Sequence, residues 1–184
     1  TCQIIHRDLK LENILVHRRD NQLRIIILDF GFACNRNPNY LFAEIENPEI
    51  IGIAQNCHKR VDLGTLAYMP FSISEKRTFE ELKKADVWAC GVILYALIYR
   101  KLPFKPFNKI PFDRQILEVE ETIAKKPTIF DRIFADIFVE LDKRKSITQL
   151  ITNHFSLLGI DRPVSQKNFE NLPTTSSILP PIRS

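Results

Sequence analysis

The sequence predicts a mainly α-helical domain that carries one small β-hairpin. Apolar residues cover nearly every face of the segment 85–99, and a helix that is apolar all round is a buried one. After residue 111, further segments repeat apolar residues at helical spacing. Near the N-terminus, two short apolar runs flank a polar stretch, which is the pattern of a strand, a turn and a second strand. We therefore expect helices packed around a central pillar, and a hairpin that holds the polar loop before it.

Length and composition fit one globular domain with its own core. The chain has 184 residues, of which 45% are hydrophobic and 26% are charged. The formal charge of +4 is mild and spread along the chain, so we expect no nucleic-acid partner. No stretch is long and apolar enough to span a bilayer, so we expect no membrane segment. The four cysteines lack paired short spacing, which favours reduced thiols in the cytoplasm, with the nucleus as the alternative.

The first element in the chain is a polar loop that runs into the hairpin. The loop reads His6-Arg7-Asp8-Leu9-Lys10-Leu11-Glu12-Asn13. We expect strands at Ile14–Val16 and Leu23–Leu28, with the polar turn His17–Gln22 between them. The second strand leads into Asp29, so the hairpin would bring Asp29 back beside Asn13 and Asp8.

This set of polar residues is suited to the transfer of a phosphoryl group to a hydroxyl. Asp8 can accept the hydroxyl proton and orient the nucleophile, and Lys10 can neutralise charge on the moving phosphoryl group. Asn13 and Asp29 offer hard oxygen ligands of the kind that Mg²⁺ prefers when it bridges nucleotide phosphates.

The residues of the loop and hairpin resemble the eukaryotic protein kinase superfamily. His6-Arg7-Asp8 with Asn13 matches its catalytic-loop pattern, and Asp29-Phe30-Gly31 matches its metal-binding motif. Lys10 resembles the serine/threonine branch. Leu11-Glu12-Asn13 and the continuation Phe32-Ala33 are similar to calcium/calmodulin- and AMP-activated-type kinases.

The resemblance implies roles for particular residues and a cofactor. Asp8 would be the base, and Thr65 would hydrogen-bond Asp8 and Lys10 to help place it. Lys10, Asn13, Leu15 and Asp29 would contact Mg²⁺–ATP, with Leu15 as the floor under the adenine ring and Asn13 and Asp29 on the metal. His6 would be a structural residue beneath Phe30.

Residues 29–71 correspond to the activation segment of such kinases. The segment is long and contains an insertion, and we expect disorder at 35–56. Phe71 stands where the family has a Glu that pairs with a late Arg, so Arg144 would be buried without its carboxylate. Val61 stands at a position that is often phosphorylated, and Arg7 would face Asp62 instead of a phosphate.

The second half of the chain is predicted to be helical. Ala85–Tyr99 is the central helix, and the resemblance implies that Asp86 holds the catalytic loop through its backbone; the alternative is an Asp that serves the helix macrodipole. Further helices are expected at 112–124, 129–141 and 146–155, the last with Ser146 as its N-cap. Residues 1–155 would form a kinase-like C-terminal lobe with catalytic loop 6–16. Residues 156–184 would form a flexible tail.

Two function classes follow from these observations. The first is a serine/threonine protein kinase, present here as a fragment or truncated form that acts on a protein substrate. The second is a catalytically inactive, kinase-derived module that binds a protein partner. The five glycines form no Gly-x-Gly-x-x-Gly motif, Met69 is the only methionine, and the chain begins almost at the catalytic loop. We therefore expect a partial sequence or a truncated gene product in which the N-terminal lobe is absent.

Overall fold

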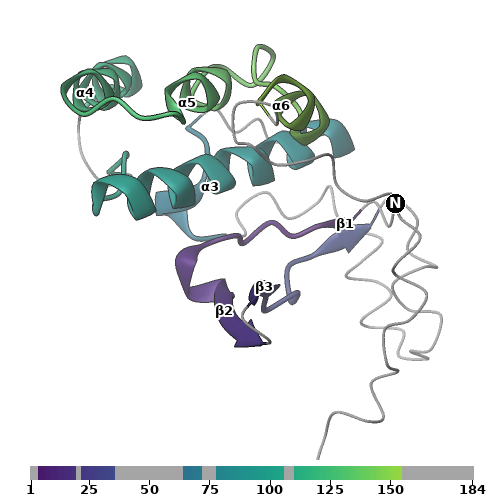
Figure 1. The fold of residues 1–184 in the computed structure, drawn as a ribbon. Helices are drawn as coiled ribbons and strands as arrows, with labels where there is room; N and C mark the ends of the chain where they lie inside the picture. Colours follow the sequence, from purple (N-terminus) through teal and green to yellow (C-terminus); the bar gives the residue numbers. More distant parts are fainter. Residues whose placement is uncertain (1–3, 20–21, 36–63, 72–77, 106–109, 155–184) are drawn as a thin grey trace, which may run out of the picture.

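One long helix, α3, separates a layer of helices from the strands. The computed structural model describes residues 4–19, 22–35, 64–71, 78–105 and 110–154. Helices α4 (Phe112–Lys125), α5 (Asp131–Ile137) and α6 (Ile147–His154) lie along one side of α3 (Phe79–Tyr99), and the strands lie on the other side (Figure 1). The predicted class, mainly helical with a small antiparallel hairpin, is confirmed.

The hairpin is longer than the sequence predicts. Strand β2 (Ile14–Arg19) pairs antiparallel with β3 (Gln22–Ile27), from Ile14 opposite Ile27 to Arg19 opposite Gln22. The predicted turn at 17–22 is therefore wrong, because most of its polar residues belong to the ladder. Strand pairing depends on backbone groups, and every residue of this hairpin except Ile14 is exposed, so polar side chains do not mark its end.

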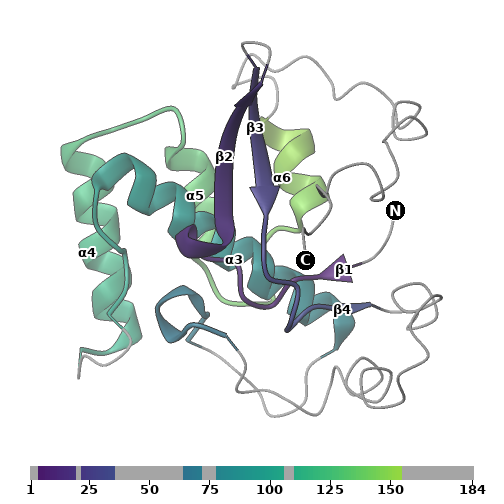
Figure 2. The ribbon, with the colours of Figure 1, turned by 90° about the horizontal axis from the view of Figure 1, so that it is seen from below.

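A second, shorter pair of strands ties the start of the chain to the start of α3. Strand β1 (Ile4–Ile5) pairs antiparallel with β4 (Cys34–Asn35), and Figure 2 shows both beside the hairpin. The fully buried Ile5 forms a small core with Cys34 and Leu82 of α3.

Helix α3 begins at Phe79 rather than at the predicted Ala85. Thr78 caps the helix: its hydroxyl accepts a hydrogen bond from the Glu81 backbone N–H, and the Glu81 carboxylate accepts one from the Thr78 backbone N–H. This capping box satisfies two of the backbone donors that a helix start leaves without intrahelical partners. The prediction began the helix too late because the charged residues at 80, 81, 83 and 84 interrupt the apolar pattern.

The sequence predicts a central helix that is buried on every face, but in the structure one end of it is exposed. Trp88 and Val92 are fully buried and Tyr95 is 1% exposed, but Leu97 near the C-terminal end is 60% exposed. Along one stripe, Gly91 lets α5 approach closely, since a Cβ on Gly91 would lie 2.6 Å from Ile137 Cγ2.

The three outer helices agree with the predicted ones except in length. Helix α4 ends one residue later than predicted, and α6 begins after Ser146, whose hydroxyl accepts a hydrogen bond from the Gln149 backbone N–H (3.3 Å), as expected of an N-cap. Helix α5 is shorter than the predicted 129–141. It ends at Ile137 because Phe138 leaves helical geometry, with a ψ angle of 53°.

Two predicted regions lie outside the described residues. Apart from Asn35, which ends β4, the segment 35–56 is not among them, and neither is the tail 156–184. Within the part of the chain that the structure describes, no helix has both the length and the apolar character needed to cross a membrane.

Gly91→Ala should destabilise the fold although alanine favours helix. Helix propensity alone would stabilise the variant by about 1 kcal/mol. The methyl group would overlap Ile137, however, and overpacking of a core costs about 1–3 kcal/mol. We expect a net loss in the free energy of unfolding, measured in urea. Leu97→Ala at the exposed end of the same helix is the control and should change little; a more stable Gly91→Ala variant would contradict the close approach.

Candidate active site

The polar loop is attached to the central helix through the side chain of Asp86. The backbone N–H groups of His6 and Arg7 donate to the two carboxylate oxygens of Asp86, at 2.7 and 2.9 Å. Burial raises the pKa of Asp86, and the two hydrogen bonds act in the opposite direction. A carboxylate is suited to this position because both of its oxygens accept.

Arg7 is held in a backbone conformation that few side chains adopt. Its φ angle is 67°, in the left-handed region. Besides the hydrogen bond to Asp86, the Arg7 Nε donates to the carbonyl oxygen of Phe32 at 2.6 Å. Left-handed geometry at a residue other than glycine costs on the order of 1 kcal/mol or more, so the surrounding contacts must hold it.

His6 is a structural residue, as expected. Its Nδ1 accepts a hydrogen bond from the Asp8 backbone N–H (3.3 Å), and its Nε2 lies 2.9 Å from the carbonyl oxygen of Leu28. A carbonyl can only accept, so Nε2 is the donor in this contact. The ring packs edge-on against Phe30, with 4.9 Å between ring centroids. His6 therefore joins the loop to the end of β3.

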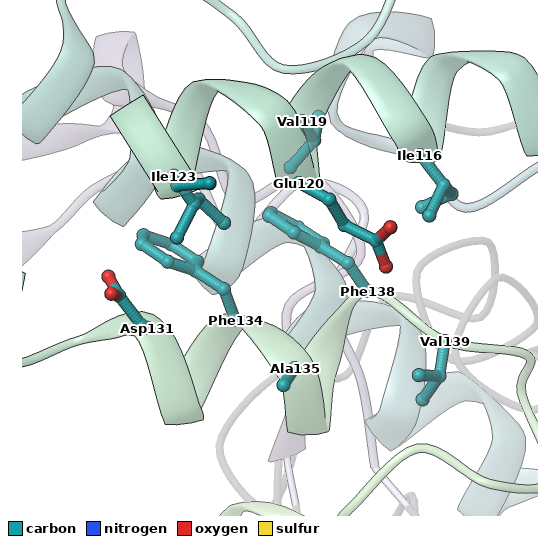
Figure 3. A pocket seen from close by; sticks show the side chains of 10 residues that line it. Ile116, Val119, Glu120, Ile123, Asp131, Phe134, Ala135, Phe138 and Val139 are labelled. Carbon is teal, nitrogen blue, oxygen red and sulfur yellow. The ribbon is translucent and has the colours of Figure 1, made fainter. Parts of the chain in front are cut away.

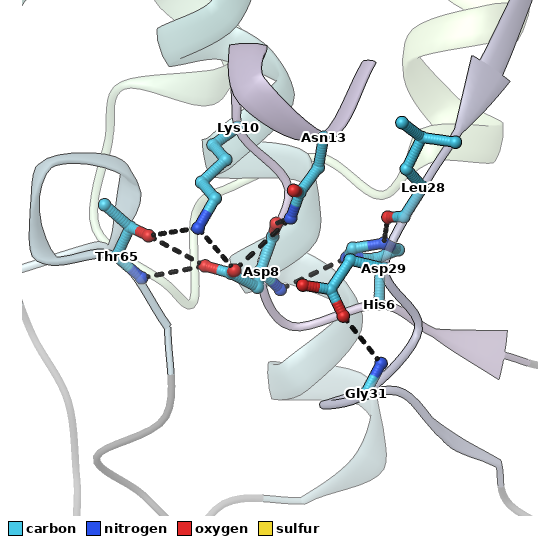
Figure 4. A network of polar contacts seen from close by, with 8 residues as sticks. All are labelled: His6, Asp8, Lys10, Asn13, Leu28, Asp29, Gly31 and Thr65. Carbon is cyan, nitrogen blue, oxygen red and sulfur yellow. Dashed lines mark hydrogen bonds and ion pairs between the residues drawn. The ribbon is translucent and has the colours of Figure 1, made fainter. Parts of the chain in front are cut away.

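Asp8 lies at the centre of a network that also contains Lys10, Asn13 and Thr65 (Figure 4). Oδ1 of Asp8 accepts hydrogen bonds from the backbone N–H and the hydroxyl of Thr65, both at 2.9 Å. Oδ2 lies 2.8 Å from Lys10 Nζ and 3.3 Å from Asn13 Nδ2. The Lys10 ammonium also donates to the Thr65 hydroxyl at 3.0 Å, so the contacts predicted for Thr65 are present.

The network keeps Asp8 ionised. Burial opposes ionisation, but hydrogen bonds from Lys10 and Thr65 and the charge of Lys10 outweigh it, so the pKa of the Asp8 carboxyl lies below its ordinary value of 3.8. The hydrogen bond to Asp8 raises the pKa of Lys10. Both groups are therefore charged at neutral pH.

Asn13 and Asp29 lie at the two ends of the hairpin, which brings them together. The Leu28 backbone N–H donates to the carbonyl oxygen of Asn13 at 2.8 Å. Asn13 Nδ2 donates to the backbone carbonyl of Asp8 at 2.9 Å, which leaves its amide oxygen for another partner. Asp29 has a φ angle of 57°, and its Oδ1 accepts the Gly31 backbone N–H at 3.1 Å.

A tight turn places Thr65 against the loop. Gly64 has a φ angle of 125°, and a Cβ there would lie 2.8 Å from the carbonyl oxygen of Arg7. Only glycine fits this approach. The turn continues into the 3-10 helix η2 (Leu66–Tyr68), whose last residue, Tyr68, is buried. Burial raises the pKa of the Tyr68 phenol.

The end of this segment is anchored differently from the way its sequence suggests. Phe71 packs against Phe112 and Phe104, with centroid separations of 4.8 and 5.5 Å. Arg144 is buried, as expected, but its guanidinium is not left without partners. Its guanidinium donates to the carbonyl oxygens of Ile137, Val139 and Lys84 at 2.9–3.2 Å and lies 4.6 Å from the centre of the Trp88 ring.

Leu15, predicted to contact adenine, lies on β2 opposite Ile26 and is 49% exposed. Phe30 is 51% exposed, so Leu15 and Phe30 both present apolar surface. Val61 and Asp62 lie outside the described residues, so the contact expected between Arg7 and Asp62 does as well.

Sequence reasoning missed several groups that position the site. The carbonyl oxygens of Leu28 and Phe32, which accept from His6 and Arg7, have no side-chain signature. Gly64 does have a signal in the sequence, because a glycine directly before a polar residue often marks a turn that needs a positive φ.

The arrangement offers a fixed, ionised carboxylate, that of Asp8, next to the ammonium group of Lys10. Such a carboxylate can accept a proton from a hydroxyl, and the ammonium can stabilise negative charge that develops beside it. Asn13 and Asp29 add side-chain oxygen atoms that can act as metal ligands. Among the described residues there is no cluster of three or more His, Cys, Asp or Glu that could hold a metal by itself. A metal here would need ligands from a bound substrate as well.

The chain is similar to known protein kinases over most of its length. The family model described as protein kinase domain matches residues 1–169. The serine/threonine-protein kinase KIN4 of Saccharomyces cerevisiae is 31% identical over 141 residues, which are 77% of this chain and 15% of that protein.

Two further relatives also match most of this chain over a small part of their own length. The serine/threonine-protein kinase PKH2 of Saccharomyces cerevisiae is 32% identical over 155 residues, or 83% of this chain and 13% of that protein. The phosphorylase b kinase gamma catalytic chain, liver/testis isoform, of Homo sapiens is 29% identical over 163 residues, or 83% of this chain and 35% of that protein. The chain thus spans well under two thirds of these relatives.

Asp86→Asn should loosen the loop. The amide keeps one acceptor and turns a donor toward the other backbone N–H, and an unsatisfied buried donor costs about 1–3 kcal/mol. We expect that loss in the free energy of unfolding, and faster hydrogen exchange at the amides of His6 and Arg7. The exposed Asp142→Asn is the control. Unchanged exchange at both amides would show that Asp86 does not hold the loop.

Lys10→Met should raise the pKa of Asp8, because Lys10 supplies the largest of the contributions that lower it. In the wild type, ionised Asp8 contributes stability that is complete above pH 3.8 and is lost as the pH falls through the lower folded-state pKa. Carbon-13 NMR titration of the Asp8 carboxyl should give a midpoint below 3.8 in the wild type and a higher one in the variant. The exposed Lys125→Met should leave the midpoint in place; an equal midpoint in Lys10→Met would refute the coupling.

Proposed function

Because the chain belongs to the protein kinase domain family, we propose that it carries the catalytic residues of a serine/threonine protein kinase. Such an enzyme transfers a phosphoryl group from ATP to a hydroxyl of a protein substrate. The relatives that match most of this chain are named as serine/threonine kinases, which supports the residue class of the substrate.

The observation that carries the proposal is the position of Asp8. Its carboxylate is buried, ionised and fixed by Thr65 on one oxygen and by Lys10 and Asn13 on the other. Thr65 makes two of the contacts and Lys10 and Asn13 make one each, and these four contacts occupy about all the acceptor positions of a carboxylate. The carboxylate is thus aimed and charged before any substrate arrives, as a positioned base should be.

We assign the roles of the chain's residues as follows. The substrate hydroxyl donates its proton to Oδ2 of Asp8, and its oxygen forms the new bond to phosphorus as the bond to the ADP oxygen breaks. Oδ2 becomes available when Lys10 moves its ammonium from Asp8 toward the transferred phosphoryl group. Thr65 holds Oδ1 throughout, so the carboxylate keeps its direction.

The residues present fit a magnesium nucleotide. Asn13 and Asp29 would hold Mg²⁺ through oxygen atoms, and Leu15 would lie against the adenine ring. Mg²⁺ is commonly bound in proteins by one or two carboxylates together with substrate phosphates, which agrees with the small number of acidic groups at this site. When bound, the magnesium nucleotide supplies the phosphoryl group and neutralises charge on its oxygens.

Residues 1–155 correspond in this proposal to the C-terminal lobe, and residues 156–184 to a tail. The described part of that lobe contains the loop, the hairpin and the central helix, and the 184 residues contain no Gly-x-Gly-x-x-Gly motif. The cover for the phosphates would then come from outside these residues. We accordingly expect turnover by this chain alone to be negligible, because an open site admits water.

A second candidate function is an inactive module that binds a protein partner. It is favoured by the exposed apolar hairpin, where Val16 and Ile25 are 60% and 70% exposed. Apolar surface of this kind on a folded chain marks an interaction site. Phe71 in place of the family's Glu points the same way.

Finer assignments rest on the sequence. We propose the calcium/calmodulin- or AMP-activated-like subgroup from Leu11-Glu12-Asn13 and Phe32-Ala33. We propose a cytoplasmic location, with the nucleus as the alternative, from the cysteine spacing.

The first test is binding of ATP to the full 184-residue chain, measured by calorimetry with and without Mg²⁺. We expect saturable binding that requires Mg²⁺ and is lost in Asp29→Ala, because that change removes a metal ligand. Asp8→Asn should retain most of the binding, since Asp8 acts on the hydroxyl rather than on the nucleotide.

Asp142→Ala, far along the chain and exposed, is the matched control for the loss of a carboxylate. If a folded wild-type chain binds no ATP, or if Asp29→Ala binds as well as the wild type, the nucleotide assignment fails. The partner-binding module would then be the better description.

A further inference from the structure

A pocket lies between α4 and α5, in the layer of helices on the far side of α3 from the polar loop (Figures 1 and 3). Its volume is about 280 Å³. Small-molecule sites in proteins usually span about 300–1,000 Å³. A space just below that range suits a single large side chain better than a complete metabolite.

The walls of the pocket are apolar. Val119 of α4 and the aromatic residues Phe134 and Phe138 are buried and line it. Ala124 and Ala135 also line it and are exposed, so two of the positions at its opening carry only a methyl group. These short side chains leave the apolar walls accessible from outside.

The charge of the pocket is opposite to that of the whole chain. The formal charge of the chain is +4, yet the only charged residues among those that line the pocket are Glu120 and Asp131. Glu120 extends from α4 into the space between the two helices (Figure 3). Asp131 uses its Oδ1 to accept hydrogen bonds from the backbone N–H and hydroxyl of Thr128.

Glu120 is the carboxylate available to a ligand. Among the described residues, no hydrogen bond or ion pair to its side chain is present, whereas the nearby Glu121 lies 3.9 Å from Lys125. No side chain that lines the pocket is a hydrogen-bond donor. A ligand that fills the apolar space and carries a cation could pair that cation with Glu120, and charge complementarity of this kind favours one class of partner over others.

We propose that this pocket is a docking site for a partner protein, which inserts a large aromatic or aliphatic side chain next to a Lys or Arg that pairs with Glu120. One or two anchoring side chains carry most of the energy of such contacts. A short amphipathic helix would present both groups one turn apart. The site goes beyond the proposed kinase activity, because α3 lies between it and Asp8.

The experiment uses the full chain and two kinds of probe. Tryptamine carries an aromatic ring and an ammonium group, and indole-3-acetate carries a similar ring with a carboxylate. We expect tryptamine to shift the NMR signals of Ile123 and Ala135 at millimolar concentration, and indole-3-acetate to shift them at least three-fold less. A displayed library of 12-residue peptides should yield sequences with a large apolar residue close to Lys or Arg.

Two variants and their controls locate the binding. Ala135→Trp should fill the pocket and weaken the selected peptides at least ten-fold, whereas Arg132→Trp, exposed on the same helix and outside the pocket, should not. Glu120→Gln should weaken them about three-fold, as expected for an exposed ion pair, and Glu118→Gln should not. Melting curves will check that each variant folds. If Ala135→Trp does not fold, Glu120→Gln with its control is enough to test the proposal.

Several results would overturn the proposal. Peptides that bind Ala135→Trp as tightly as the wild type do not use the pocket. Equal binding of tryptamine and indole-3-acetate, or no effect of Glu120→Gln, would remove the charge argument. A library that yields no peptide while tryptamine binds would assign the pocket to small cations. Displacement of tryptamine by a peptide of residues 174–184 would assign it to the chain's own tail.

Discussion

The two hydrogen bonds from the backbone of His6 and Arg7 to Asp86 are the contact on which the rest of the site depends. They attach a loop to the side chain of a helix 80 residues away in the sequence. Once Arg7 is held there with a positive φ, its carbonyl oxygen faces Gly64 so closely that a Cβ would not fit. That contact in turn places Thr65 against the carboxylate that it orients. One half-buried carboxylate on a rigid helix thus fixes segments that have few regular hydrogen bonds of their own.

The anchoring of Phe71 and Arg144 shows how one interaction can replace another at the same place. The sequence suggested a buried arginine deprived of its carboxylate, which would be costly. Instead, three carbonyl oxygens and the face of Trp88 surround Arg144. Phe71 joins the aromatic side chains at the start of α4. Two of the three carbonyl oxygens, those of Ile137 and Val139, lie at or just past the C-terminal end of α5, where carbonyl oxygens lack intrahelical partners and are ready acceptors for a cation. Phe71 in place of the family's Glu therefore leaves the guanidinium of Arg144 without that carboxylate but not without partners.

The molecule presents two surfaces of different character on the two sides of α3. The hairpin side carries the polar network and exposed apolar strands, and the helical side carries the small acidic pocket. Both are joined to α3: Asp86 holds the loop, and Phe138, which lines the pocket, contacts the ring of Trp88 with 5.2 Å between centroids. The central helix is thus the rigid element that both sides share. Its burial explains why the residues on it are mostly large and apolar.

The sequence by itself determined the class of the fold, the helices after residue 111 and the polar residues that meet around Asp8. Those features follow from local periodicity, from residue chemistry and from spacing in a hairpin, all of which can be read along a chain. The early start of α3 belongs with them, because the capping box of Thr78 and Glu81 is a pattern that can be read in the sequence. Only the tertiary structure decided the true length of the hairpin and the partners of Arg144. Each of these depends on backbone groups, such as the carbonyl oxygens that Arg144 contacts. Every residue carries the same backbone groups, so their partners are decided by packing and not by the letters of the sequence.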